Sequence, residues 1–135
     1  MRSREFITES SDIRSKLDGF VEYACKCIGL DHPPEIVLID SKKHAVAQGS
    51  FGGYSLDDKN IRVNIAGRHA ADIMRTLAHE LVHARQDRTI DGGLTAEDGV
   101  TGSPYENEAN SLAGQIMRDY AKKNPAIFES RRASR

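Results

Sequence analysis

The chain of 135 residues has no tryptophan, only two cysteines and a net charge of -1. So small a net charge excludes a strongly basic protein that recruits nucleic acid or anionic membranes through its overall field. Cys25 and Cys27 lie two positions apart in a segment that we expect to be helical, where their side chains diverge and cannot form a disulfide. We therefore expect two free thiols and no zinc site built on cysteine.

Long apolar runs are also absent. No stretch approaches the roughly 18 apolar residues of a membrane span, and the charged start lacks the apolar core of a secretory signal. We therefore expect a cytoplasmic protein with no membrane partner. The length suits a single domain, which we place at residues 11–125, between a flexible leader at residues 1–10 and a basic flexible tail at residues 126–135.

Apolar residues recur at helical spacing in three segments of the chain. The first segment spans residues 11–28 and the second lies within residues 67–92. The third follows Ser103, where Pro104 and Glu106 complete the pattern of a helix N-cap with a proline at the first position and a capping-box glutamate. Each segment predicts a helix with one apolar face.

Extended segments lie between the first and second predicted helices. Residues 35–40 are apolar and β-branched, which is typical of a buried strand. Residues 44–56 form a weaker, glycine-interrupted arm of a hairpin, and its second arm at residues 61–65 alternates apolar and polar residues. The order of elements predicts an α+β fold in which the helices pack on a small mixed or antiparallel sheet.

The second predicted helix carries the motif His79-Glu80-Leu81-Val82-His83. Two imidazoles four residues apart project from the same face of a helix and can bind one metal ion. Zinc lowers the pKa of a coordinated water to about 7, so that a neighbouring carboxylate such as Glu80 suffices as its base. We therefore predict a zinc site on His79 and His83, with Glu80 as a catalytic residue.

Such a site needs a third protein ligand from another element. The last predicted helix offers Glu106 and Glu108, which diverge by about 200° around the helix, so that only one can face the metal. The capping box accounts for Glu106. Glu108 lies one turn before Leu112 on the apolar side, where an unpaired carboxylate is costly. We therefore predict Glu108 as the third ligand.

These residues resemble the gluzincins, peptidases with a His-Glu-x-x-His motif and a ligand glutamate on the next helix. The resemblance covers about residues 61–120. Asn107-Glu108-Ala109 resembles the Asn-Glu-Ala of thermolysin-type enzymes, and the helix after Glu108 is similar to that of the ImmA/IrrE-like group. The resemblance implies a zincin-like fold, a zinc cofactor and peptide-bond hydrolysis, with Glu108 as a ligand. Leu112 departs from the pattern, since thermolysin-type enzymes usually carry a histidine-orienting aspartate there.

The resemblance also implies how a substrate would bind. In small gluzincins the strand before the metal helix pairs with an extended peptide, which here would be the strand from Ile61 to Ile65. A residue besides the metal must stabilise the oxyanion. Tyr105 is our catalytic candidate for this role, and His69 and Tyr54 are alternatives.

Two other functions are compatible with the same motif. A zincin-like fold can keep its metal as structure and act as a non-catalytic binding module. An enzyme similar to the SprT-like proteases would digest protein on DNA, but those enzymes usually use a third histidine, and none follows His83. Peptide hydrolysis is the reading that we prefer.

Overall fold

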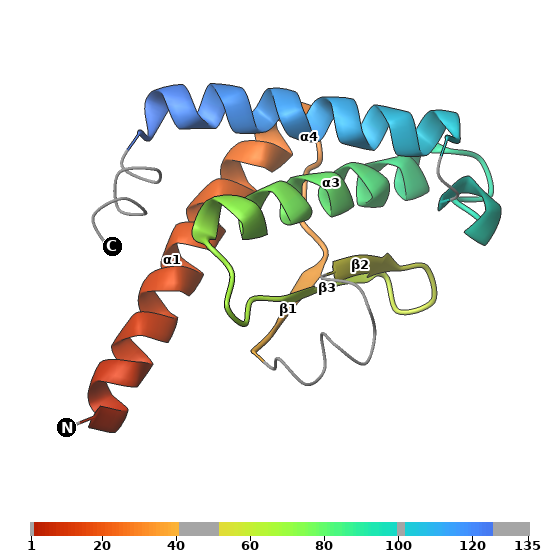
Figure 1. Ribbon diagram of the computed structural model, residues 1–135. Coiled ribbons are helices and arrows are strands. Elements are labelled where there is room, and N and C mark those ends of the chain that lie inside the picture. The colour runs from red at the N-terminus through yellow and green to blue at the C-terminus, as the bar shows by residue number, and fades with distance from the viewer. Residues whose placement is uncertain (1, 41–51, 100–101, 126–135) are drawn as a thin grey trace.

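The computed structural model describes residues 2–40, 52–99 and 102–125. Its elements are α1 (Arg2–Ile28), β1 (Glu35–Ile39), β2 (Gly52–Ser55), β3 (Asn60–Asn64), α3 (Ala70–Thr89), a short 3-10 helix η1 (Ala96–Gly99) and α4 (Pro104–Lys123). The predicted α+β class is confirmed. Helix α3 lies between α4 on one side and the sheet on the other, and α1 packs across the two helices (Figure 1).

The helices begin and end close to the predicted residues, with one exception. α1 starts at Arg2, so that residues 2–10, which we predicted as a flexible leader, are helical. It ends where Gly29 adopts a φ of 72° and the N–H of Leu30 donates to the carbonyl of Cys25, a left-handed helix end that glycine favours. The predicted tail at residues 126–135 and most of the first hairpin arm lie outside the described residues.

The sheet is mixed, with strand order β1-β3-β2. β1 pairs with β3 in parallel, and β2 pairs with β3 antiparallel. Strand β3 therefore has a neighbour on each side, and its backbone cannot accept a further strand. This corrects our prediction that a peptide adds to residues 61–65. Within the described part of the chain, β2 is the edge strand that lies beside β3 and contacts α3.

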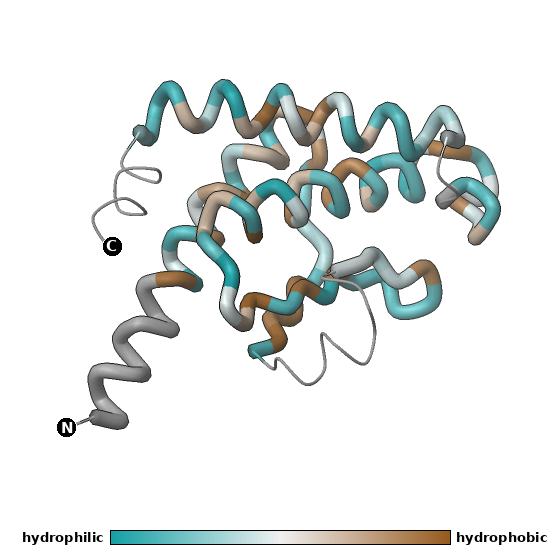
Figure 2. Tube along the Cα trace, in the orientation of Figure 1, coloured by the Kyte–Doolittle hydropathy of each residue, from teal (hydrophilic) through white to brown (hydrophobic). Residues whose placement is uncertain are grey.

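The apolar core lies where α1, the first half of α3 and the second half of α4 meet. Phe20 is fully buried, and its ring packs edge-on against Tyr120 at a centroid distance of 5.0 Å. Figure 2 shows the alternation of apolar and polar turns along the helices that this packing requires. The fully buried side chains also include Ile61, Val63, Ile73, Met74, Leu77, Leu81 and Val82.

The two cysteines are free, as predicted, with Cys25 buried and Cys27 exposed. None of the helices in residues 2–40, 52–99 and 102–125 combines the length and apolarity needed to cross a membrane.

Candidate metal centre

Helix α3 brings the two motif histidines together, as the spacing predicted. The Nε2 atoms of His79 and His83 lie 3.1 Å apart, and the two rings meet edge to face with centroids 4.7 Å apart. Tetrahedral zinc holds its nitrogen ligands at about 2.0–2.1 Å, which puts neighbouring ligand atoms slightly more than 3 Å from one another. The two imidazoles are therefore close to the arrangement that one ion requires.

Glu106, in the first turn of α4, supplies the third group. Its Oε1 lies 2.8 Å from Nε2 of His79, and its Oε2 lies 3.0 Å from Nε2 of His83. The candidate ligand atoms of these three residues all lie within 4.8 Å of one another. Two imidazole nitrogens and a carboxylate oxygen form a donor set that suits zinc.

The third ligand that we predicted, Glu108, is not at this site. The capping argument failed because the cap uses only the backbone of Glu106: its N–H donates to Ser103 Oγ at 3.1 Å. The side chain of Glu106 remains available and turns toward the histidines. A residue can thus serve a helix cap through its N–H and a metal site through its carboxylate.

Glu108 has other partners. Its side chain is 46% exposed, and it contacts Arg85 at 3.4 Å and accepts a hydrogen bond from Gln86 at 2.7 Å. The cation that we expected beside this carboxylate is therefore an arginine on α3. The likeness of Asn107-Glu108-Ala109 to thermolysin-type enzymes does not correspond to the geometry of the site.

The hydrogen bonding of His83 favours a cation at the centre. Nδ1 of His83 lies 2.8 Å from Oε1 of Gln86, and a carbonyl oxygen can only accept, so Nδ1 carries a proton. In the neutral ring Nε2 then presents a lone pair to Oε2 of Glu106 at 3.0 Å. Two lone pairs repel at that distance unless a proton or a metal ion lies between them, so the residues fit a divalent metal.

Glu80 is the fourth titratable group of the cluster and lies on a flank of the same helix face. The residue is only 9% exposed. Burial raises the pKa of Glu80 above its ordinary value, although the two histidines and a hydrogen bond from the backbone N–H of Tyr54 oppose the shift. A buried carboxylate with a raised pKa beside a candidate metal is a typical general base.

The cluster opens into a cavity of about 370 Å³. One wall comes from β2 and the turn after it, and another from η1 and the segment between α3 and η1. The lining residues are Gly53, Tyr54, Leu56, His79, Glu80, His83, Leu94, Thr95, Ala96, Asp98 and Glu106. A cavity of this size accommodates one or two side chains of an extended ligand.

Of the three candidates for the oxyanion, only Tyr54 lines this cavity. Tyr105 is half-buried at the start of α4, and the contact recorded for it uses its backbone carbonyl, which accepts from Gln86 at 3.0 Å. His69 is exposed at the N-cap of α3, ten residues before His79. The geometry therefore favours Tyr54 over the Tyr105 that we predicted.

Asp87 ties the two walls of the cavity together. One carboxylate oxygen accepts from Tyr54 at 2.8 Å and from Lys59 at 2.7 Å, and the other accepts from the N–H of Leu94 at 2.8 Å. Burial alone would raise the pKa of Asp87, but these hydrogen bonds outweigh it and lower the pKa. Gly93 allows the close approach, because a Cβ there would lie 2.7 Å from Asp87 Oδ1.

The same contact affects Tyr54. Burial and the hydrogen bond to Asp87 raise the pKa of Tyr54 to about 12. The phenol therefore keeps its proton at neutral pH and donates it in a hydrogen bond to Asp87.

We did not predict Gln86 or Asp87 as residues of the site from the sequence. A signal was present, because Gln86 follows His83 by three positions and Asp87 by four, which places both near His83 on the helix surface.

No family model, curated protein or solved structure matches this chain. Its function must therefore be inferred from the geometry of the site.

Proposed function

We propose that the protein is a zinc-dependent metallopeptidase in which His79, His83 and Glu106 hold the ion and Glu80 is the general base. The observation that carries the proposal is the convergence of two imidazole Nε2 atoms and one carboxylate on a cavity that also contains a buried carboxylate. As part of it, we assign the α+β fold to the zincin-like group that the gluzincin resemblance implies.

Zinc in this position would polarise the scissile carbonyl and bring the pKa of a coordinated water to about 7. The protein's own residues supply the general base and the hydrogen-bond donors. Glu80 accepts the proton of the attacking water and later delivers it to the leaving amine. The backbone N–H of Tyr54 holds the Glu80 carboxylate. The Tyr54 phenol has a single O–H, which donates to Asp87 in the structure, and it would transfer this hydrogen bond to the oxyanion as the oxyanion forms.

The substrate is an extended peptide that pairs with the edge of β2. Gly53 and Tyr54 of this strand line the cavity, and the space where a Cβ of Gly53 would lie is open. Main-chain hydrogen bonds to an edge strand bind peptides with little sequence preference. The neighbouring Leu56 and Leu94 offer apolar contact for one substrate side chain.

Three features favour this function over the alternatives. A non-catalytic binding module has no use for Glu80, whose burial costs stability. A protease of SprT-like type usually has a third histidine, whereas among the described residues the third group at the site is Glu106. With a net charge of -1 the chain also lacks the basic excess expected of a DNA-binding enzyme.

The test is the change Glu80→Gln, with Glu22→Gln as its control, because Glu22 is 74% exposed on α1. Loss of a general base lowers kcat/KM by about 10²–10⁴-fold. We expect this loss for Glu80→Gln on a diverse peptide library, with zinc content unchanged, and full activity for the control. Cleavage that survives Glu80→Gln contradicts the mechanism. A zinc-loaded wild type that cleaves no peptide contradicts the peptidase and favours the binding module.

A further inference from the structure

Gln86 is a buried amide that links the candidate metal centre to α4. The residue is 3% exposed. Its Oε1 lies 2.8 Å from Nδ1 of His83, and its Nε2 lies 3.0 Å from the carbonyl oxygen of Tyr105 and 2.7 Å from Oε1 of Glu108. Every polar atom of this side chain is therefore engaged.

These partners determine which way the amide faces. The Tyr105 carbonyl and the Glu108 carboxylate have no proton to donate, so the group opposite them must be the NH₂ of Gln86. Its oxygen then faces His83, where it accepts a hydrogen bond from the Nδ1 proton. Reversing the amide would set oxygen against two acceptors and lose both hydrogen bonds.

The hydrogen bond on one ring nitrogen of a histidine decides which nitrogen is available to a metal. With its proton held on Nδ1, His83 directs the lone pair of Nε2 toward His79 and Glu106. We infer that Gln86 is a positioning residue that fixes His83 in its metal-binding tautomer and orientation, and that Glu108 and the Tyr105 carbonyl in turn fix Gln86. This inference rests on the proposed function, since it concerns the same metal centre.

The chain of contacts continues away from the site. Arg85 lies 3.4 Å from Oε2 of Glu108 and donates to the carbonyl of Ile28 at 3.3 Å. Glu108 is thereby held relative to the end of α1 as well as to α3. A histidine-orienting aspartate of the thermolysin type is absent at Leu112, and Gln86 performs that task from the metal-binding helix itself.

The experiment compares zinc affinity, measured by competition with a chelating dye, in the wild type and in Gln86→Met. Methionine keeps the length of the side chain and removes its hydrogen bonds. Gln115→Met is the matched control, because Gln115 is exposed on α4. Loss of a hydrogen-bond partner of a metal ligand typically costs 10–100-fold in metal affinity. We expect about that loss for Gln86→Met and none for the control.

A second readout is the tautomer of His83 in the zinc-free protein, observed through the nitrogen-15 shifts of its ring. We expect the Nδ1-protonated form in the wild type and its loss in Gln86→Met. Unchanged zinc affinity and an unchanged tautomer in Gln86→Met would overturn the inference. If the wild type binds no zinc, the proposed function fails, and the tautomer still decides the role of Gln86.

A second variant, in which the side chains of residues 86 and 108 are exchanged, keeps the inference testable if Gln86→Met does not fold. The double change Gln86→Glu with Glu108→Gln conserves charge and keeps an acceptor for Nδ1 of His83. It loses only the hydrogen bond to the Tyr105 carbonyl, to which a carboxylate cannot donate. We expect this protein to retain the Nδ1-protonated tautomer and to bind zinc within about tenfold of the wild type, below the range of a lost hydrogen-bond partner. Loss of that tautomer in the folded double variant contradicts the inference.

Discussion

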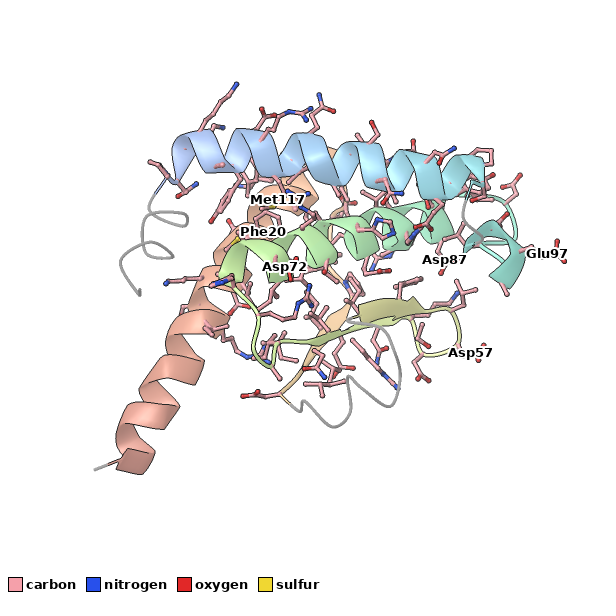
Figure 3. The ribbon with its side chains drawn as sticks, viewed as in Figure 1. Phe20, Asp57, Asp72, Asp87, Glu97 and Met117 are labelled. Carbon is pink, nitrogen blue, oxygen red and sulfur yellow. The ribbon has the colours of Figure 1, made fainter. Side chains whose placement is uncertain are left out.

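The two halves of helix α3 do different work although both are buried. Its first half presents Ile73, Met74 and Leu77 to the core that contains Phe20 and Met117. Its second half also buries apolar residues, but it adds four polar or charged side chains with less than a tenth of their surface exposed: Glu80, His83, Gln86 and Asp87. Figure 3 shows the two regions apart, with Phe20 and Met117 toward one end of the helices and Asp87 toward the other end.

The two halves of α3 therefore contribute differently to the stability of the fold. Apolar burial in the first half lowers the free energy of the folded state. Polar burial in the second half costs free energy unless each group is paired. Of the six buried polar or charged side chains in the described part of the chain, four lie within residues 80–87. A fold that carries so many costly groups in two turns of helix has a use for them.

The largest effect is expected in the core half. Phe20→Ala removes a fully buried aromatic ring, which typically costs 3–5 kcal/mol of unfolding free energy. Chemical denaturation of the zinc-free protein measures this loss. Because distant sites are nearly independent, the zinc affinity of the folded variant should stay within about twofold of the wild type. A large loss of zinc affinity would show that the two halves are coupled.

A smaller, pH-dependent effect is expected for Asp87→Asn. Asp87 has a lowered pKa in the folded state, so its contribution to stability is present above the unfolded pKa of about 3.9 and is lost as the pH falls through the folded pKa. We expect the variant to lose about 1–3 kcal/mol at pH 7 and to approach the wild type in acid.

The control for Asp87 is Asp58→Asn, since Asp58 and its ion-pair partner Arg62 are both more than half exposed. An exposed pair contributes less than about 1 kcal/mol. Urea titrations at pH 7 and pH 3 compare the two variants. Equal losses for Asp87→Asn and Asp58→Asn, or a loss at Asp87 that grows in acid, would refute the account of Asp87.

The smallest effects are expected for the two tyrosines. Tyr54→Phe removes the single O–H of Tyr54, which donates to Asp87 in the structure and is the proposed oxyanion donor, so it should lower kcat/KM and cost about 0.5–1.5 kcal/mol of stability. Tyr105→Phe keeps the backbone carbonyl that Gln86 uses, and kcat/KM should stay within about twofold, as for other changes away from a site. A greater loss at Tyr105 would restore it as the oxyanion donor.

Much of the fold followed from the sequence because the apolar pattern is local. The spacing around Phe20 and Leu77 predicted two helices, and Ser103 marked the start of the third. Strand order was not predictable in this way, since the parallel pairing of β1 with β3 joins segments far apart in the chain. The strand proposed to bind substrate was therefore taken as an edge although it is central.

The site was predictable only where one element supplies it. His79 and His83 share a helix, so their spacing determined their geometry. The choice between Glu106 and Glu108 depends on how α4 is rotated against α3, which tertiary packing decides. The roles of Gln86 and Asp87 depend on partners from other segments, and residue type alone does not reveal them.

The most direct test of the metal centre is the zinc affinity of Glu106→Gln compared with that of Glu108→Gln, measured by chelator competition. Loss of a ligand should exceed the 10–100-fold that an orienting residue is worth. We therefore predict a loss of more than about 100-fold for Glu106→Gln and a smaller one, under about tenfold, for Glu108→Gln. The reverse order, or a wild type that binds no zinc, would contradict the assignment of His79, His83 and Glu106 as the ligands.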